Sequence, residues 1–242
     1  MMDPLPRVAV VPTHNRPVEL ARLLDAIAPQ CHAVFVIDNA STPPVELPER
    51  WPAQGREDPA APGTFLLGVR VFVIRDEEQP PNLSRLWNVG LNAAREYVRG
   101  GDYAGHDVAV FNDDADVPAG WWNVVSGALR GHPTAAVACT PAYARIPGPV
   151  LKTEPDSDLW SRMTPWAFVA RGELDQRADE RLRWWWGDTS WDFTARKLGG
   201  VLTVPGPIVA NTGANSSTVG ALAEQAGRDR ETFREVWGFN PW

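Results

Sequence analysis

The 242-residue sequence contains few cysteines and no long apolar run. Cys31 and Cys139 lie in or beside apolar stretches, so we expect two buried free thiols, with a single disulfide as the alternative. These two residues alone cannot form a metal site. No stretch approaches the ~18 apolar residues that a membrane-spanning helix needs, and residues 1–7 lack the apolar core of a signal peptide. We therefore expect no membrane insertion and a cytoplasmic location.

Lysine is scarce as well, since only Lys152 and Lys197 occur. The 23 basic residues are outnumbered by 30 acidic ones, which gives a net charge of −7. Binding a phosphate backbone requires a positive face, so the composition argues against a general polyanion binder, unless the arginines within 177–196 form a patch. A content of 44% hydrophobic and 22% charged residues is typical of a folded protein. Twelve tryptophans indicate an aromatic core or stacking surfaces for a sugar ring.

Short β-branched apolar runs alternate with segments of helical periodicity over the first 140 residues. After Pro17, the apolar residues Leu20, Leu23, Leu24 and Ile27 form a helical stripe. Continuous apolar strands separated by helices predict an α/β fold with a mostly parallel sheet and helices on both faces. The predicted strands are 8–11, 34–37, 69–74, 108–111, 135–139, 166–170 and 201–204. Further helices are predicted after the cap residue Asn82 and within 181–199 and 219–236, and loops over 42–63 and 206–217.

Polar residues follow three of the predicted strands, at 13–15, 38–39 and 112–114. In parallel sheets, ligands bind at the carboxyl ends of the strands, so these residues predict one site. The last group opens the acidic run Asn112-Asp113-Asp114-Ala115-Asp116. Clustered carboxylates repel one another unless a cation or a hydrogen-bonding ligand compensates them. Their hard oxygens suit Mg²⁺ or Mn²⁺, which commonly complete their shells with substrate phosphates. A plain acidic loop is the alternative interpretation.

Five segments resemble, in order, the signatures of family 2 glycosyltransferases, and together they span approximately residues 7–200. They are VAVVPTHNRP (8–17), VFVIDNAST (34–42), NLSRLWNVGLNAA (82–94), VAVFNDDADVPAGWW (108–122) and DERLRWWWGDTSWDFTARKLG (179–199). The resemblance implies a single GT-A, Rossmann-like domain over 1–242. Residues 1–122 would bind the nucleotide sugar and residues 123–242 the acceptor. The implied activity is transfer of a sugar from a nucleotide-diphosphate sugar to an acceptor hydroxyl, with inversion.

The resemblance also implies roles for individual residues. The residues that would bind the nucleotide are Thr13, Asn15, Arg16, Asp38, Asn88 and Asp113. Metal binding falls to Asp114 and Asp116, and the catalytic base is Asp188, with Asp192 as the alternative. Contact with the sugar or acceptor falls to Trp121, Trp185, Trp186 and Asn211, although Trp121 and its neighbour Trp122 favour the core. In this chemistry a carboxylate takes the proton of the acceptor hydroxyl, while Mn²⁺ or Mg²⁺ neutralises the departing diphosphate.

Three positions depart from the family pattern. The acidic pair of the family reads Gly187-Asp188 here, so one acid is missing. Asn211 stands where several relatives have a metal-binding histidine, and an amide oxygen is a weaker ligand for a transition metal. Asn112 is neutral where many relatives have an acid. We therefore expect a loosened dependence on metal.

Two other functions stay open on the sequence. A non-catalytic module of the same fold would keep the sugar-nucleotide pocket without turnover. A nucleotidyltransferase is disfavoured, because no glycine-rich phosphate loop with a lysine follows the first strand. The acceptor is a glycan, a protein hydroxyl or, less favoured by the acidic charge, a modified DNA base. No basic amphipathic helix supports a lipid acceptor.

Overall fold

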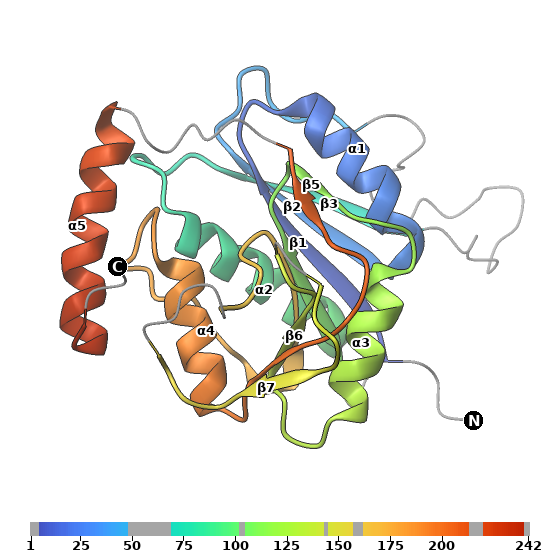
Figure 1. The fold of residues 1–242 in the computed structure, drawn as a ribbon. Coiled ribbons are helices and arrows are strands. Elements are labelled where there is room, and N and C mark those ends of the chain that lie inside the picture. The colour runs from blue at the N-terminus through green and yellow to red at the C-terminus, as the bar shows by residue number, and fades with distance from the viewer. Residues whose placement is uncertain are drawn as a thin grey trace, which may run out of the picture.

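The computed structural model describes residues 5–47, 69–101, 105–142, 145–156, 162–212 and 220–239. Within these ranges an eight-stranded sheet has the order β3-β2-β1-β4-β8-β6-β9-β7 (Figure 1). Its strands are β1 (Arg7–Thr13), β2 (Ala33–Asn39), β3 (Arg70–Asp76), β4 (Asp107–Phe111), β6 (Val137–Cys139), β7 (Val150–Lys152), β8 (Ala167–Arg171) and β9 (Val201–Thr203). A short antiparallel ribbon pairs β5 (Ala115–Asp116) with β10 (Ala210–Asn211).

The sheet combines a parallel half with a mixed half. β3, β2, β1 and β4 are parallel neighbours, as are β6 and β9. β8 runs antiparallel between β4 and β6, and β7 runs antiparallel to β9. The predicted α/β fold with a mostly parallel sheet is confirmed. The antiparallel position of β8 and the edge strand β7 were not predicted, because apolar runs carry no information on strand direction.

Helices cover both faces of the sheet (Figure 1). They are α1 (Pro17–Ile27), α2 (Leu83–Gly100), α3 (Trp121–Gly131), α4 (Gly187–Lys197) and α5 (Gly220–Trp237). α1 and α3 pack on the face that carries Ala9 and Val11, whereas α2 and α4 pack on the face that carries Val8 and Val10. Because successive strand residues point to opposite faces and both faces are buried, the stretch Val8–Val11 of β1 is apolar without interruption.

The apolar residues that predicted these elements are buried. The stripe Leu20, Leu23, Leu24 and Ile27 is at most 3% exposed. Cys31 and Cys139 are buried free thiols, as expected. The helix predicted within 181–199 begins only at Gly187, and α5 lies one residue from its predicted bounds. Parts of the two predicted loops, 48–63 and 213–217, lie outside the described residues.

α5 packs on the outer side of α4 rather than on the sheet (Figure 1). Phe193 of α4 and Phe233 of α5 are buried against each other, with ring centroids 5.8 Å apart. Leu182 and Trp186 complete this cluster. None of the described helices has the length and apolar character that crossing a membrane requires.

Gly90 sets how closely α2 approaches β1. A Cβ placed on Gly90 would lie 2.2 Å from Cγ1 of Val10. We predict that Gly90→Ala lowers the free energy of unfolding by about 1–3 kcal/mol, because it forces the helix away from the strand. In the matched control Gly127→Ala, on α3, nothing lies within 4 Å of the added methyl group. This control should gain about 0.5–1 kcal/mol from helix propensity. Urea unfolding of both variants measures the difference, and a neutral Gly90→Ala would contradict the packing argument.

Candidate active site

The carboxyl ends of β1, β2, β3 and β4 meet at one edge of the sheet because these strands are parallel. In the strand register, Thr13 lies opposite Asp38, and Asp38 lies opposite Arg75. The acidic run follows β4 at the same edge. The hydroxyl of Thr13 donates a hydrogen bond to Oδ2 of Asp113 at 2.8 Å. The structure therefore brings together the polar strand ends from which the sequence predicted a site.

Asp113 and Asp114 form a buried acidic pair joined by one arginine. Nη1 of Arg16 lies 2.7 Å from Oδ2 of Asp114 and 3.1 Å from Oδ1 of Asp113. The carboxylate side chains are only 9% and 6% exposed. Arg16 directly precedes α1, so the first turn of this helix holds the arginine over the acidic pair. Thr212, beyond β10, donates two hydrogen bonds to the backbone oxygen of Asp114.

Burial opposes the negative charge of Asp113. Burial is the largest influence on Asp113 and raises its pKa. Hydrogen bonds and charge from Thr13 and Arg16 lower the pKa, and the neighbouring Asp114 raises it again. The net pKa lies above the ordinary value for an aspartate. Burial therefore disfavours the charged form of Asp113 more than Thr13 and Arg16 stabilise it.

The residues at this edge fit a small divalent cation that shares its shell with a ligand. Among the described residues, no three His, Cys, Asp or Glu side chains cluster tightly enough to hold a metal by themselves. Oδ1 of Asp114 is nevertheless buried without a hydrogen-bond partner within that part of the chain. Asp116 is exposed on β5, and Asn211 of β10 pairs with Ala115 beside it. Two buried carboxylates with further oxygen donors suit Mg²⁺ or Mn²⁺ completed by phosphate and water.

Asp38 organises the loop after β2. Its oxygens accept hydrogen bonds from the backbone N–H groups of Ser41 and Val45 and from the guanidinium of Arg75. Burial alone raises the pKa of Asp38, but these hydrogen bonds and the charge of Arg75 outweigh it, so the net pKa is lowered. Asn15 has a left-handed backbone and ties the same loop to β1, since its side-chain oxygen accepts from the N–H of Thr42. Both residues build the wall of the site.

Asn88 connects α2 to the chain that leads into α4. Its amide nitrogen donates to the backbone oxygen of Ala178 and to Oε1 of Glu180, at 3.0 and 2.8 Å. Its amide oxygen accepts from the N–H of Ala178. The structure thus places this predicted nucleotide-binding residue in a buried structural contact. The contact also holds the 178–180 segment, which precedes α4, against α2.

Gly187, the first residue of α4, stands where the resemblance to family 2 glycosyltransferases would place an acid. A Cβ at Gly187 would lie 2.5 Å from Oγ of Ser84 and 3.4 Å from the ring of Trp87. Because both contacts belong to the first turns of α2, α4 starts directly against α2. No acidic side chain fits at position 187. The close packing also places Asp188, the next residue, beside the start of α2.

The two acids considered as catalytic base lie in different environments. Asp188 is half-buried in the first turn of α4 and has no hydrogen-bond or ion-pair partner within the described ranges. Asp192 is fully buried, and its carboxylate lies 2.7 Å from the equally buried guanidinium of Arg196. A group with no exposed surface cannot take a proton from an acceptor hydroxyl without a rearrangement. Of these two acids, only Asp188 has an exposed part.

Asp229 of α5 holds the tryptophan segment, a role that the sequence analysis missed. Its side chain is fully buried. Its two oxygens accept hydrogen bonds from the backbone N–H groups of Arg183, Trp184 and Trp185, at 2.7–3.1 Å. The available signal was an acid four residues before Phe233, on the buried face of a predicted helix. α5 thereby fixes the turn that leads into Asp188.

The tryptophans predicted to contact sugar divide between core and surface. Trp121 is fully buried and its indole N–H donates to Thr140, so it has no surface to offer a ligand. Trp186 is 4% exposed, whereas Trp185 is half-buried. Trp185 and Trp186 border a groove of about 240 Å³ against α5. The remaining lining residues are Ala223, Ala226, Gly227 and Arg230.

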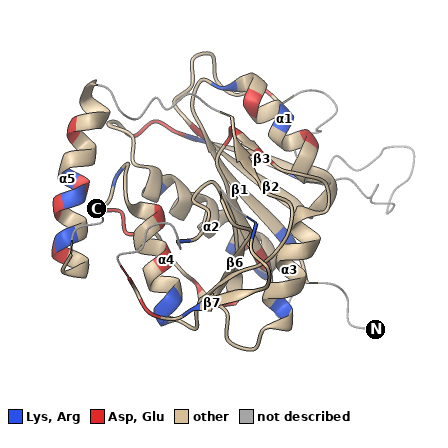
Figure 2. Cartoon of the chain, viewed as in Figure 1, with Lys and Arg blue, Asp and Glu red and all other residues tan. Residues whose placement is uncertain are grey.

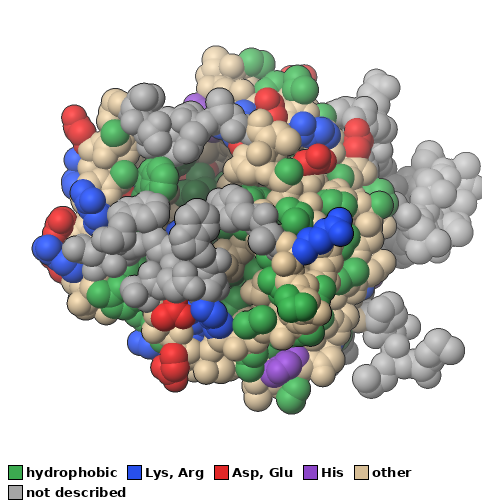
Figure 3. Space-filling model, viewed as in Figure 1, with side chains coloured by type: hydrophobic (Ala, Val, Ile, Leu, Met, Phe, Trp, Pro, Cys, Tyr) green, Lys and Arg blue, Asp and Glu red, His purple; other side chains and the backbone are tan. Residues whose placement is uncertain are grey.

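The arginines of 177–196 do not form a basic patch. Each lies beside a carboxylate, in the pairs Arg177–Asp175, Arg181–Asp179, Arg183–Glu78 and Arg196–Asp192. In Figure 2, basic and acidic residues also alternate along α5, and Figure 3 shows both signs interspersed over this face. A nucleic-acid surface would require the arginines within 177–196 to form a positive patch, and in the described structure they do not.

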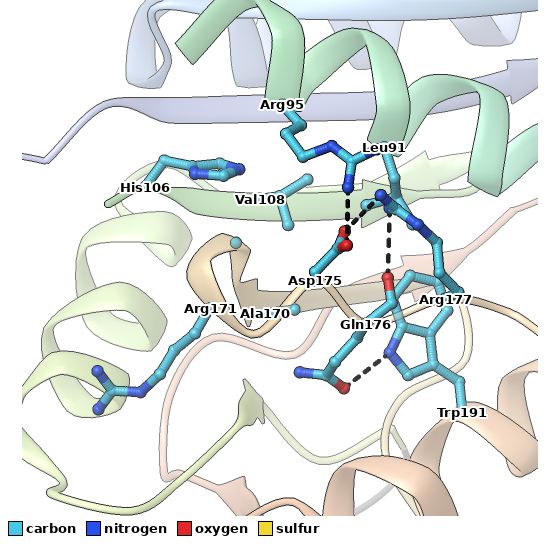
Figure 4. Close-up of a pocket in the computed structure, with 11 residues that line it drawn as sticks. Leu91, Arg95, His106, Val108, Ala170, Arg171, Asp175, Gln176, Arg177 and Trp191 are labelled. Carbon is cyan, nitrogen blue, oxygen red and sulfur yellow. Dashed lines mark hydrogen bonds and ion pairs between the residues drawn. The ribbon is translucent and has the colours of Figure 1, made fainter. Parts of the chain in front are cut away.

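A small cavity lies at the opposite end of the sheet, between His106 before β4 and Gly172 after β8 (Figure 4). Arg95 and Arg177 both point to Asp175 there. Its volume of about 10 Å³ corresponds to a single water site. This cavity is too small for a nucleotide sugar, and the ion pairs serve to fasten α2 to the 175–177 segment.

The sequence matches no protein-family model and no curated protein. The structure is similar to S. aureus TarS, with a TM-score of 0.54 and 15% identity over 97% of this chain and 72% of that one. It is also similar to glucosyl-3-phosphoglycerate synthase from Mycobacterium tuberculosis, solved with phosphoglyceric acid. The TM-score is 0.60 and the identity 15%, over 97% of this chain and 81% of that one. For the mannosyltransferase PcManGT from Pyrobaculum calidifontis, solved with GDP-Man and Mn²⁺, the TM-score is 0.51 and the identity 13%, over 88% of this chain and 59% of that one. These likenesses show that the chain has the GT-A fold.

Asp192 gives the fold a specific pH dependence. Burial raises the pKa of Asp192 to about 6, although Arg196 acts in the opposite direction. Because the folded-state pKa exceeds the unfolded value, the carboxyl stabilises the fold at low pH, and this contribution is lost as the pH rises through about 6. The stability lost between pH 4 and 7 corresponds to about 2 kcal/mol. We predict that Asp192→Asn removes this dependence. Urea unfolding of wild type and variant at pH 4.5 and 7 measures the change in the free energy of unfolding. If this change is the same in both proteins, Asp192 is not its source.

Proposed function

We propose that this protein is a glycosyltransferase that moves a sugar from a nucleotide-diphosphate sugar to an acceptor hydroxyl, with inversion and with the help of Mn²⁺ or Mg²⁺. The observation that carries the proposal is the buried Asp113–Asp114 pair, joined to Thr13 and Arg16 at the carboxyl edge of a GT-A sheet. This pair lies where open α/β sheets bind their ligands, and Oδ1 of Asp114 is buried there without a hydrogen-bond partner within the described residues. A cation and a nucleotide sugar are ligands that match both properties.

The structural neighbours support this class of donor. The Mycobacterium tuberculosis synthase was solved with UDP-glucose and Mn²⁺, and TarS with UDP. In the present chain, Asp113 and Asp114 would hold the cation, which would supply positive charge for the departing diphosphate. Thr13 orients Asp113 through its hydroxyl. Asn15 and Asp38 shape the loop walls beside which the nucleoside would lie.

Asp188 is the proposed catalytic base. Its carboxylate lies in the first turn of α4, which packs against the first turns of α2, and is free of partners among the described residues. An inverting transfer needs a carboxylate on the acceptor side to accept the hydroxyl proton as the sugar–phosphate bond breaks. Asp192 would support α4 through its ion pair with Arg196.

The acceptor would approach from the side of α4 and α5. Trp185 offers a half-buried indole face beside the 240 Å³ groove, and such faces stack on sugar rings. Asn211 is exposed on β10 next to the acidic run, within the same edge. We therefore propose a glycan or a protein hydroxyl as acceptor. The paired arginines argue against a modified DNA base.

A donor screen tests the activity. Nucleotide-diphosphate sugars with different bases and sugars are incubated with Mn²⁺ or Mg²⁺, and release of the nucleoside diphosphate is read by mass spectrometry. We expect slow hydrolysis of one donor class that increases with the divalent cation. If calorimetry detects binding of a nucleotide sugar while no donor is hydrolysed or transferred, the protein is a non-catalytic module of the same fold.

The base assignment makes a sharper prediction. Asp188→Asn should lower transfer by about 10²–10⁴-fold, because no other carboxylate replaces the proton acceptor. Binding of the nucleoside diphosphate, measured by calorimetry, should be unchanged. Asp175→Asn is a matched control, since Asp175 pairs with Arg95 beside the small cavity at the other end of the sheet. Retained transfer in Asp188→Asn would exclude this residue as the base.

A further inference from the structure

Arg16 lies between the two carboxylates that a divalent cation would use. Its Nη1 contacts one oxygen of Asp113 and one of Asp114, and its side chain is 28% exposed, against 9% and 6% for the acids. A guanidinium remains charged at every physiological pH. The acidic pair is thus closed by a cation that belongs to the protein and whose side chain is partly exposed to solvent.

A divalent cation and the guanidinium compete for the same oxygens. Two like-charged groups close together at a poorly solvated site repel one another, so the cation binds well only after Arg16 has moved. The guanidinium then needs a new anionic partner. A diphosphate accepts two parallel hydrogen bonds from an arginine, and it would arrive at the same edge with the cation.

We propose that Arg16 is an internal counter-ion that blocks the Asp113–Asp114 pair to free divalent cations and turns to the diphosphate when the donor binds. This inference rests on the proposed function for the identity of the diphosphate ligand. It has a thermodynamic consequence. Because binding of the diphosphate relieves the competition, cation and nucleotide favour each other's binding, and by linkage the coupling is equal in both directions.

The test measures Mn²⁺ binding rather than turnover. Free Mn²⁺ is titrated into the metal-free protein and followed by electron paramagnetic resonance, first without nucleotide and then with UDP or GDP. Wild type should bind Mn²⁺ weakly without nucleotide. Arg16→Gln should bind it at least about ten-fold more tightly and should lose most of the enhancement by nucleotide. The control Arg99→Gln removes the same charge from the last turn of α2, where Arg99 pairs with Glu96. It should behave as wild type.

Two further measurements keep the test decisive. Thermal unfolding of Arg16→Gln shows that the variant folds, and added Mn²⁺ should raise its melting temperature more than that of wild type. Introducing Asp114→Asn into the Arg16→Gln variant should abolish the tight Mn²⁺ binding, which assigns the ion to the acidic pair. Mn²⁺ binding that is unchanged or weaker in Arg16→Gln, or that survives Asp114→Asn, overturns the proposal. A protein that shows the predicted Mn²⁺ behaviour but hydrolyses and transfers no donor would refute the proposed activity and leave the counter-ion role intact.

Discussion

The parallel pairing of β1 with β2 and β4 is the constraint on which the rest of the structure depends. It places three strand ends at one edge of the sheet, so that Thr13 reaches Asp113 across 100 residues of sequence. Both faces of β1 are buried, and α2 approaches one of them closely enough to require Gly90. The start of α4, which carries Asp188, packs in turn against the start of α2. Each later element of the site is thus positioned relative to β1.

Charge compensation is the second organising principle. The carboxylates at this edge are buried, and each is matched in its own way: Asp38 by backbone N–H groups and Arg75, and Asp113 and Asp114 by Arg16. At the acidic pair the compensation is incomplete, since Oδ1 of Asp114 is buried without a hydrogen-bond partner among the described residues. Burial also raises the pKa of Asp192, but its partner Arg196 is buried with it inside the fold, whereas Arg16 at the acidic pair is partly exposed.

Much of the fold could be predicted because local sequence patterns determine it. The apolar runs at β1, β2 and β4 and the stripe from Leu20 to Ile27 require burial whatever the topology. The acidic run after β4 could be recognised because carboxylates rarely follow a buried strand without a counter-charge. The direction of β8 could not be predicted, since parallel and antiparallel neighbours bury the same residues. Edge strand β7 is short and half exposed, so it left no pattern.

The sequence by itself determined the alternating α/β elements, the acidic run and the polar strand ends, because hydrophobic periodicity and clustered charge are local properties. Only the tertiary structure decided how the polar groups are used. Asn88 and Asp229 form hydrogen bonds with backbone groups of distant segments, and Trp121 is buried in the core. At Gly187 the close contact with α2 leaves no space for a second acid. Arg16 became the bridge between two acids almost a hundred residues away. Hydrogen-bond partners and steric space depend on which distant segments meet, and that information exists only after the chain has folded.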